Sequence, residues 1–242
     1  MVNTSLINSS NNPEYFVFYD LDHTLTGAVS GTEMVKSAYR KGLMRNRDLL
    51  LTAIRLLGYK LEIKDPLELI EDVAKWLKGM PEGKMNEIFT EVFRDKLKPA
   101  FYREAWSEIE KHKLNKARSI LLSSSLKPVC QMVAEHFRLD DIICSDLEVV
   151  NGLYTGKSVG AYCFREEKAV RLKDYCEKNN SSPELSWYYG DSIDDLPALD
   201  IVGNPVCVNP DKKLLKVARQ KGWRVYEWGK QGRGEEVEWV KG

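Results

Sequence analysis

The chain has 242 residues, of which 36 are basic and 36 acidic, so it carries no formal net charge. This length suits one large domain, or one domain with an insertion, around a sizeable core. Charge balance gives no sign of a nucleic-acid partner or of binding to an anionic membrane. The N-terminus is polar and lacks the apolar core of a signal peptide, and no stretch approaches the roughly 20 apolar residues of a membrane span, so we expect a cytoplasmic protein.

A buried strand is predicted at Tyr15–Tyr19, and a long helical block follows it. The helices expected there are Thr32–Lys41, Arg47–Leu57, Pro66–Lys78 and Glu82–Lys96. A block of this size between the first two sheet strands is too long for an ordinary crossover. We therefore expect a helical cap at residues 31–97, inserted into a core made of residues 1–30 and 98–242, with hinges at Thr26–Ser30 and Leu97–Ala100.

Beyond the block, short apolar runs alternate with helical patterns. The predicted strands are Ser119–Leu122, Ile142–Cys144, Leu185–Tyr189, Val206–Val208 and Trp223–Tyr226. The predicted helices are Lys127–Phe137, Glu166–Asn179, Ile193–Leu199 and Lys212–Lys221. Alternation of this kind predicts an α/β fold with a parallel sheet covered by helices on both faces. The Asn-Gly pair within Leu147–Gly156 predicts a tight hairpin that projects from the sheet.

Polar residues follow several of these strands. They are Asp20, Asp22 and Thr24 after the first strand, Ser123, Ser124 and Ser125 after the second, and Asp191, Asp194 and Asp195 after Leu185–Tyr189. Lys168 lies at the start of the helix that leads into this last strand. Ligands bind at the carboxyl ends of the strands in open parallel sheets, so we expect these side chains to lie together in one crevice at that edge of the sheet.

The chemistry of these residue types is mutually consistent. Crowded carboxylates without nearby His or Cys offer hard oxygen ligands, which suit Mg²⁺ and not zinc, and the cation would offset the repulsion between Asp20 and Asp22. Ser123 and the backbone N–H groups that follow it can hold phosphate oxygens, and Lys168 supplies a positive charge. One carboxylate can attack phosphorus, and a second can act as general acid and base.

Each of these residues also has an ordinary structural use when it is taken alone. Asp22 and Thr24 could end a strand, and the serine run could cap a helix. Lys168 could be a solvated helix residue, and Asp194 and Asp195 could be first-turn acids favoured by the helix dipole. The joint pattern favours the functional interpretation.

Four segments together resemble the motifs of the haloacid dehalogenase-like (HAD) hydrolases: "DLDHTLT", "LLSSS", Lys168 and "GDSIDDLPAL". The helical block resembles the cap of the phosphoserine-phosphatase-like branch, subfamily IB. The resemblance implies a Rossmann-like three-layer parallel sheet with an inserted all-helical cap, and a Mg²⁺-dependent phosphatase that works through an aspartyl-phosphate.

The resemblance also implies a role for each matching residue. Asp20 would be the nucleophile and Asp22 the general acid/base, and the backbone carbonyl of Asp22 would also bind the metal. Thr24 would brace the loop, and Ser123 and Lys168 would hold the phosphoryl group. Asp191 would bind the metal, and Asp195 would support that site. Thr24, Ser124 and Asp194 complete the expected substrate-binding set.

The substrate follows less directly from the residues. Phosphoserine phosphatases carry a Glu where this chain has Val29, often an Asn where it has Asp194, and commonly S-G-G where it has S-S-S. We therefore expect a small phosphorylated substrate such as a phosphorylated amino alcohol or head-group-like phosphomonoester. A phosphoserine phosphatase, a phosphomutase and a non-catalytic phosphate-binding or signalling module are the alternatives, and the sequence specifies no oligomeric state.

Overall fold

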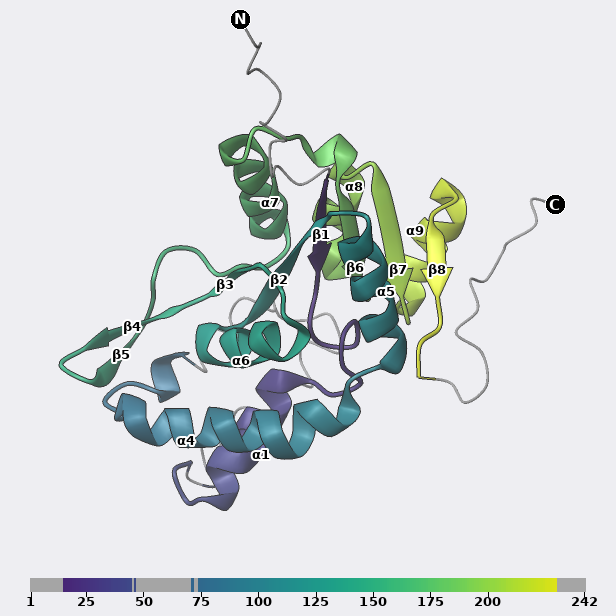
Figure 1. Ribbon diagram of the computed structural model, residues 1–242. Coiled ribbons are helices and arrows are strands. Elements are labelled where there is room, and N and C mark those ends of the chain that lie inside the picture. Colours follow the sequence, from purple (N-terminus) through teal and green to yellow (C-terminus); the bar gives the residue numbers. More distant parts are fainter. Residues whose placement is uncertain (1–14, 45, 47–70, 72–73, 230–242) are drawn as a thin grey trace, which may run out of the picture.

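The sheet of this protein has six parallel strands in the order β3-β2-β1-β6-β7-β8 (Figure 1). The computed structural model describes residues 15–44, 46, 71 and 74–229. The strands are β1 (Phe16–Tyr19), β2 (Arg118–Leu126), β3 (Asp141–Ser145), β6 (Trp187–Gly190), β7 (Asn204–Val208) and β8 (Arg224–Tyr226). All six predicted strands lie in this sheet, so the predicted α/β fold is confirmed.

Helices cover both faces of the sheet because neighbouring residues of a strand point to opposite sides. In β1, Phe16 and Phe18 belong to one apolar cluster, whereas Val17 and Tyr19 belong to the other. The first cluster includes residues of α7 (Glu166–Lys178), α8 (Leu196–Ile201) and α9 (Lys212–Lys221). The second includes residues of α5 (Arg103–Leu114) and α6 (Lys127–Phe137). The strands are therefore buried on both sides, as their nearly continuous apolar runs require.

The helical block between β1 and β2 lies beyond the carboxyl ends of the strands (Figure 1). Its described helices are α1 (Ser30–Arg40), α4 (Glu82–Val92), the π-helical turn Phe93–Leu97 and the 3₁₀ turn Lys98–Ala100. Apolar side chains of α1 and α4, including Met34 and Phe89, join one buried cluster. The predicted helix Arg47–Leu57 and much of Pro66–Lys78 lie outside the described residues.

The two connections between this block and the sheet run side by side. The Gly27 N–H donates to the Ala100 carbonyl at 2.9 Å, and the Tyr102 N–H donates to the Leu25 carbonyl at 3.0 Å. Thr26 Oγ1 also bonds the Leu97 carbonyl, at 3.4 Å. These bonds join the two segments that the sequence predicts as hinges; the division into a core and a cap stays a prediction.

A hairpin of β4 (Leu147–Val150) and β5 (Leu153–Ser158) projects beyond the sheet and confirms the predicted turn. Its turn residues, Asn151 and Gly152, both have positive φ angles, 51° and 75°, which Asn and Gly tolerate best. Backbone bonds from Tyr154 to Met80 (3.0 Å) and from Glu82 to Gly152 (2.9 Å) join the hairpin to the start of α4.

Several predicted boundaries differ from the structure, mostly by one or two residues, and the following differences lie near the strand ends. The strand expected at Ser119–Leu122 continues to Leu126 in β2, with an irregular register after Ser123. The strand expected at Leu185–Tyr189 begins at Trp187, since Pro183 starts a short 3₁₀ turn ahead of it. A second 3₁₀ turn, Ile193–Asp195, precedes α8 where one helix was expected. No helix in the described part of the chain is long and apolar enough to cross a membrane.

Candidate active site

The polar strand ends meet where the strand order of the sheet reverses. The chain continues from β1 through β2 and β3 toward one edge, whereas β6, β7 and β8 continue toward the other edge. Loops diverge at such a point and leave a crevice at the carboxyl ends of the strands. Asp20 directly follows β1 and Asp191 directly follows β6, so both lie at this crevice. The Asp20 N–H donates to the Tyr189 carbonyl at 2.9 Å, which fixes the start of the loop.

Lys168 is buried, with 4% of its surface exposed, and its ammonium group contacts three acceptors. Its Nζ lies 2.8 Å from Asp20 Oδ1, 2.7 Å from Asp195 Oδ1 and 3.2 Å from the Tyr188 hydroxyl. An ammonium group has three donors, so these contacts satisfy all of them. The interpretation of Lys168 as a solvated helix residue is therefore wrong.

Asp195 uses both carboxylate oxygens to hold this arrangement together. Oδ1 accepts from Lys168 and, at 2.7 Å, from the Tyr188 hydroxyl, while Oδ2 accepts the N–H groups of Asp191 (3.2 Å) and Ser192 (3.3 Å). Gly190 makes this approach possible, because a Cβ at that position would lie only 2.8 Å from Asp195 Oδ2. The glycine of "GDSIDD" is thus a steric requirement of the site.

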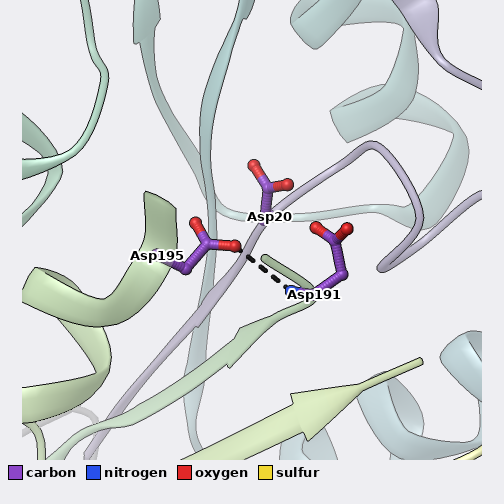
Figure 2. Close-up of side chains that lie close together, drawn as sticks. All are labelled: Asp20, Asp191 and Asp195. Carbon is purple, nitrogen blue, oxygen red and sulfur yellow. Dashed lines mark hydrogen bonds between the residues drawn. The ribbon is translucent and has the colours of Figure 1, made fainter. Parts of the chain in front are cut away.

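Three carboxylates face one another at the crevice. Figure 2 shows Asp20, Asp191 and Asp195 approaching from separate segments, with the Asp191 N–H bonded to Asp195. One oxygen from each lies within 4.8 Å of the others, and no other group of His, Cys, Asp and Glu side chains within residues 15–44 and 74–229 meets this criterion. These oxygens form the only candidate metal site in the part of the chain that the structure describes.

The electrostatics of this group suit a divalent cation. Burial is the main cause that raises the pKa of Asp20 to about 7; Lys168 opposes this shift, and Asp195 and Asp22 add to it. Burial, followed by repulsion from Asp195 and Asp20, raises the pKa of Asp191 well above its usual range. Burial by itself would lower the pKa of Lys168, but Asp195 and Asp20 raise it well above its usual value. The single positive charge of Lys168 cannot balance all three carboxylates when they are ionised. Their oxygens are hard ligands of the kind that Mg²⁺ prefers.

Asp22 lies apart from the three-carboxylate group and faces α1. Its Oδ1 accepts the Ser30 N–H and its Oδ2 accepts the Ser30 hydroxyl, both at 3.0 Å. Burial raises the pKa of Asp22 to about 6, while the two bonds from Ser30 oppose that shift. The side chain of Asp22 is therefore not placed with the other predicted metal ligands; a contribution through its backbone carbonyl stays a prediction.

The predicted phosphate-binding serines lie in the last part of β2, directly ahead of α6. Ser123 is buried and its Oγ accepts the Ser125 N–H at 3.2 Å, whereas Ser124 is partly exposed. α6 begins only at Lys127, because β2 continues beyond its irregular register. Thr24 is completely buried, and its hydroxyl has no hydrogen-bond partner within the described residues. Its roles in bracing the loop and in binding the substrate stay predictions.

Asp194 forms an ion pair instead of facing solvent at the first turn of a helix. Its Oδ1 lies 2.7 Å from Arg165 Nε, and only 12% of its side chain is exposed. Arg165 immediately precedes α7 and has φ 47° and ψ −118°, a backbone conformation that residues other than glycine rarely adopt. The ion pair holds the Arg165 side chain beside the helix that carries Lys168.

Sequence reasoning missed three residues of this site: Ser30, Arg165 and Tyr188. Arg165 lies 29 residues from Asp194 and Tyr188 lies 20 residues from Lys168, whereas Ser30 lies only 8 residues from Asp22 but meets it across a loop. No helical or strand spacing indicated these contacts. Ser30 was assigned only to a hinge, and Tyr188 was treated only as an apolar strand residue. The one available signal was the alternation of "WYYG", which places Tyr188 and Tyr189 on opposite faces of the sheet.

Comparison with known proteins agrees with this geometry. Residues 17–200 match the model of the family described as haloacid dehalogenase-like hydrolase. An inhibition of morphological differentiation protein of Streptomyces azureus is 28% identical over 221 residues, which span 89% of this chain and 79% of that protein. A probable phosphatase of Mycobacterium tuberculosis is 27% identical over 216 residues, spanning 88% and 75% of the two chains.

Two solved structures show the same fold. A Bordetella pertussis protein of unknown function superposes with a TM-score of 0.80 at 24% identity, covering 88% of this chain and 98% of that one. A phospho-aspartyl intermediate analogue of phosphoserine phosphatase gives a TM-score of 0.66 at 15% identity, covering 85% and 91%. The chain belongs to the haloacid dehalogenase-like hydrolase family and has the fold of its phosphoserine phosphatases. It is therefore an enzyme of the hydrolase class, with phosphatases among its relatives.

Mg²⁺ is expected to raise the melting temperature more at about pH 8 than at about pH 5. The pKa of Asp20 is about 7 in the folded state against 3.8 as its ordinary value, so the folded protein retains a proton that the unfolded chain has released. The stability that this proton contributes is fully present below the ordinary pKa of 3.8 and is lost as the pH rises through the folded-state pKa of about 7. The cation binds ionised carboxylates, so it restores stability where the proton has left.

Thermal unfolding in Mg²⁺ and in EDTA at both pH values measures this increment. Asp191→Asn removes one of the three carboxylates and should reduce the increment at the higher pH. An increment that is equal or larger at the lower pH would contradict the assignment of this group as the metal site.

Proposed function

We propose that the protein is a Mg²⁺-dependent phosphatase that hydrolyses a small phosphomonoester through an aspartyl-phosphate on Asp20. The observation that carries this proposal is the buried ammonium of Lys168 between Asp20 and Asp195, with Asp191 beside them. Phosphoryl transfer asks a protein mainly for positioning and for neutralisation of charge, and this arrangement offers both.

Asp20 is the proposed nucleophile. Its Oδ1 is held by Lys168, which leaves Oδ2 to attack phosphorus. The new bond joins Asp20 to phosphorus, and the bond between phosphorus and the leaving oxygen breaks in line with it. Ser123 would hold the phosphoryl oxygens, with Ser124 at the partly exposed end of β2. Lys168 would offset their charge, and it would bond them directly by turning one of its three donors away from its present acceptor. Asp194 is proposed to contribute to the substrate side through its ion pair with Arg165.

Asp22 is the proposed general acid/base. In the first half-reaction it would protonate the leaving alkoxide. In the second it would take a proton from the water that attacks the phosphorus of phospho-Asp20, while the bond between phosphorus and the Asp20 oxygen breaks, so that inorganic phosphate leaves and the Asp20 carboxylate is restored. Its pKa, raised to about 6 by burial, keeps a fraction of the carboxyl protonated near neutral pH, as an acid and base in turn requires. Its position outside the three-carboxylate group supports this role, because the leaving group departs on the side opposite the nucleophile.

Asp20 and Asp191 would hold the metal directly, together with the backbone carbonyl of Asp22. Asp195 would support the site, because its two oxygens already bind Lys168 and the turn after β6. When bound, Mg²⁺ supplies positive charge that offsets the charge of the phosphoryl oxygens.

The substrate is proposed to be a phosphorylated amino alcohol or a head-group-like phosphomonoester, selected by a helical cap at residues 31–97. Val29 occupies the position where phosphoserine phosphatases carry a glutamate, and it immediately precedes α1. Glu33, the next acid along the chain, lies 2.6 Å from Lys36 on the same helix, so its charge is already paired. The apolar side chain of Val29 and the paired charge of Glu33 together favour a substrate other than phosphoserine.

Purified protein is expected to release phosphate from para-nitrophenyl phosphate only with Mg²⁺, and Asp20→Asn should lower the rate by about 10³-fold or more. The amide keeps the shape of the side chain but is a far weaker nucleophile. Circular dichroism verifies that the variant is folded. Wild-type protein that binds phosphate without turnover would favour the non-catalytic alternative, and full activity in EDTA would contradict the role of the metal.

Asp22→Asn is expected to accumulate phosphoenzyme from para-nitrophenyl phosphate. Departure of nitrophenolate needs little acid assistance, whereas the attack of water needs the base that this variant lacks. Acid quenching followed by intact-mass measurement should show a gain of one phosphoryl group, which Asp20→Asn should not show. A variant that hydrolyses the substrate without any such gain would contradict the assigned roles.

A panel of phosphomonoesters at fixed Mg²⁺ should give a higher kcat/KM for a phosphorylated amino alcohol than for phosphoserine. The physical reason is that phosphoserine carries a carboxylate as well as an ammonium group, so it has one more charge to remove from water beside the apolar side chain of Val29 than a phosphorylated amino alcohol has. The highest kcat/KM on phosphoserine would instead make phosphoserine phosphatase the better assignment.

A further inference from the structure

We propose that Ser30 and Ser125 are positioning residues that hold the Asp22 carboxylate toward the leaving group of the substrate. This inference rests on the proposed role of Asp22 as general acid. Ser30 is the first residue of α1 and Ser125 lies near the end of β2, so they come from the helical block and from the sheet.

The three side chains form a continuous series of hydrogen bonds. Ser30 contacts both oxygens of Asp22 at 3.0 Å, through its backbone N–H and its hydroxyl. The Ser30 and Ser125 hydroxyl oxygens are 2.6 Å apart. Ser30 is 4% exposed, so little water can compete for these bonds. Two contacts from one residue fix the plane of the carboxylate as well as its position.

The supply of protons sets the direction of this series. A hydroxyl has one proton to donate, and Ser30 gives its proton to Asp22. The Ser30 oxygen therefore accepts the proton of Ser125, and Ser125 orients Ser30. A carboxylate offers about four lone-pair sites, so two stay available for the proton that Asp22 transfers to the leaving oxygen.

Ser125 is itself held on two sides. Its N–H donates to Ser123 Oγ at 3.2 Å, and its carbonyl accepts from Cys130 Sγ at 3.6 Å. The orientation of Asp22 is thereby linked to Ser123, the serine proposed to hold the phosphoryl group. A rotation of either serine would turn the carboxylate of Asp22, and small errors in the placement of a catalytic group cost rate steeply.

This arrangement assigns the two carboxylates of the first loop to opposite sides of the reacting phosphorus. Asp20 belongs to the three-carboxylate group, while Asp22 is directed at the start of α1. A general acid must lie where the leaving oxygen departs, in line with and opposite to the nucleophile. Ser30 and Ser125 keep Asp22 on that side.

The test compares two substrates whose leaving groups differ in their need for an acid. Nitrophenolate leaves para-nitrophenyl phosphate with little proton assistance, whereas the alkoxide of 2-glycerophosphate needs it. Ser30→Ala and Ser125→Ala should each lower kcat/KM for 2-glycerophosphate by about tenfold or more, and for para-nitrophenyl phosphate by less than about threefold. kcat/KM is the suitable quantity because it reports the steps up to departure of the leaving group.

Ser37→Ala is the matched control, since Ser37 also lies buried on α1 and donates to Glu91 on α4 at 2.8 Å. It should change kcat/KM for both substrates equally. Ser30→Thr keeps the hydroxyl and should restore most of the loss on 2-glycerophosphate.

Equal losses on the two substrates after Ser30→Ala, or no loss on 2-glycerophosphate after Ser125→Ala, would overturn the positioning role while leaving the phosphatase intact. Wild-type protein inactive on both substrates, or Asp20→Asn as active as wild type, would overturn the proposed function itself, and with it the role of the two serines.

Discussion

The ammonium of Lys168, buried between two carboxylates, is the interaction on which the rest of the site depends. It joins the end of β1, the first turns of α7 and the turn after β6. Ions removed from water each cost several kcal/mol unless they are paired and hydrogen-bonded, and loss of one partner from such a pair costs about 3–5 kcal/mol. Asp20, Asp195 and Tyr188 together satisfy the three donors of Lys168. The contacts that stabilise this region are thus the same ones that place the proposed nucleophile.

Asp20 and Asp22, the two acids of the loop after β1, have different surroundings. Asp20 is shared between Lys168 and the carboxylates after β6, whereas Asp22 is held by the start of α1. Because α1 begins at Ser30, the position of the helical block and the orientation of Asp22 are linked by two hydrogen bonds. Helix α4 of the same block packs on α6, and the β4–β5 hairpin forms backbone hydrogen bonds with the chain at the start of α4. Substrate selection and acid catalysis are therefore expected to depend on one set of contacts.

Most of the fold could be predicted because its strands are buried on both faces and read as apolar runs. The Asn-Gly turn was equally clear, since only a few residues tolerate two positive φ angles in succession. The errors lie at element ends, where tertiary contacts decide the outcome. β2 extends past Ser123 because β3 pairs with it as far as Leu126. The region of the proposed cap could be outlined only by its helical pattern, and two of its predicted helices fall largely or wholly outside the described residues.

The sequence by itself determined which residue types follow each strand, and hence that acids, serines and a lysine would meet at one edge of a parallel sheet. It could not determine how these groups pair, because hydrogen bonds depend on side chains that are far apart in the chain. The three acceptors of Lys168 lie 148, 27 and 20 residues from it, and Arg165 lies 29 residues from Asp194. Ser30 lies only 8 residues from Asp22, but the loop between them has no regular spacing that would indicate the contact. Only the tertiary structure decided that Asp195 holds a lysine and a turn, that Asp194 pairs with Arg165, and that Ser30 orients Asp22. The physical reason is that strand order sets proximity, whereas packing and the need to satisfy each buried polar group set the partners.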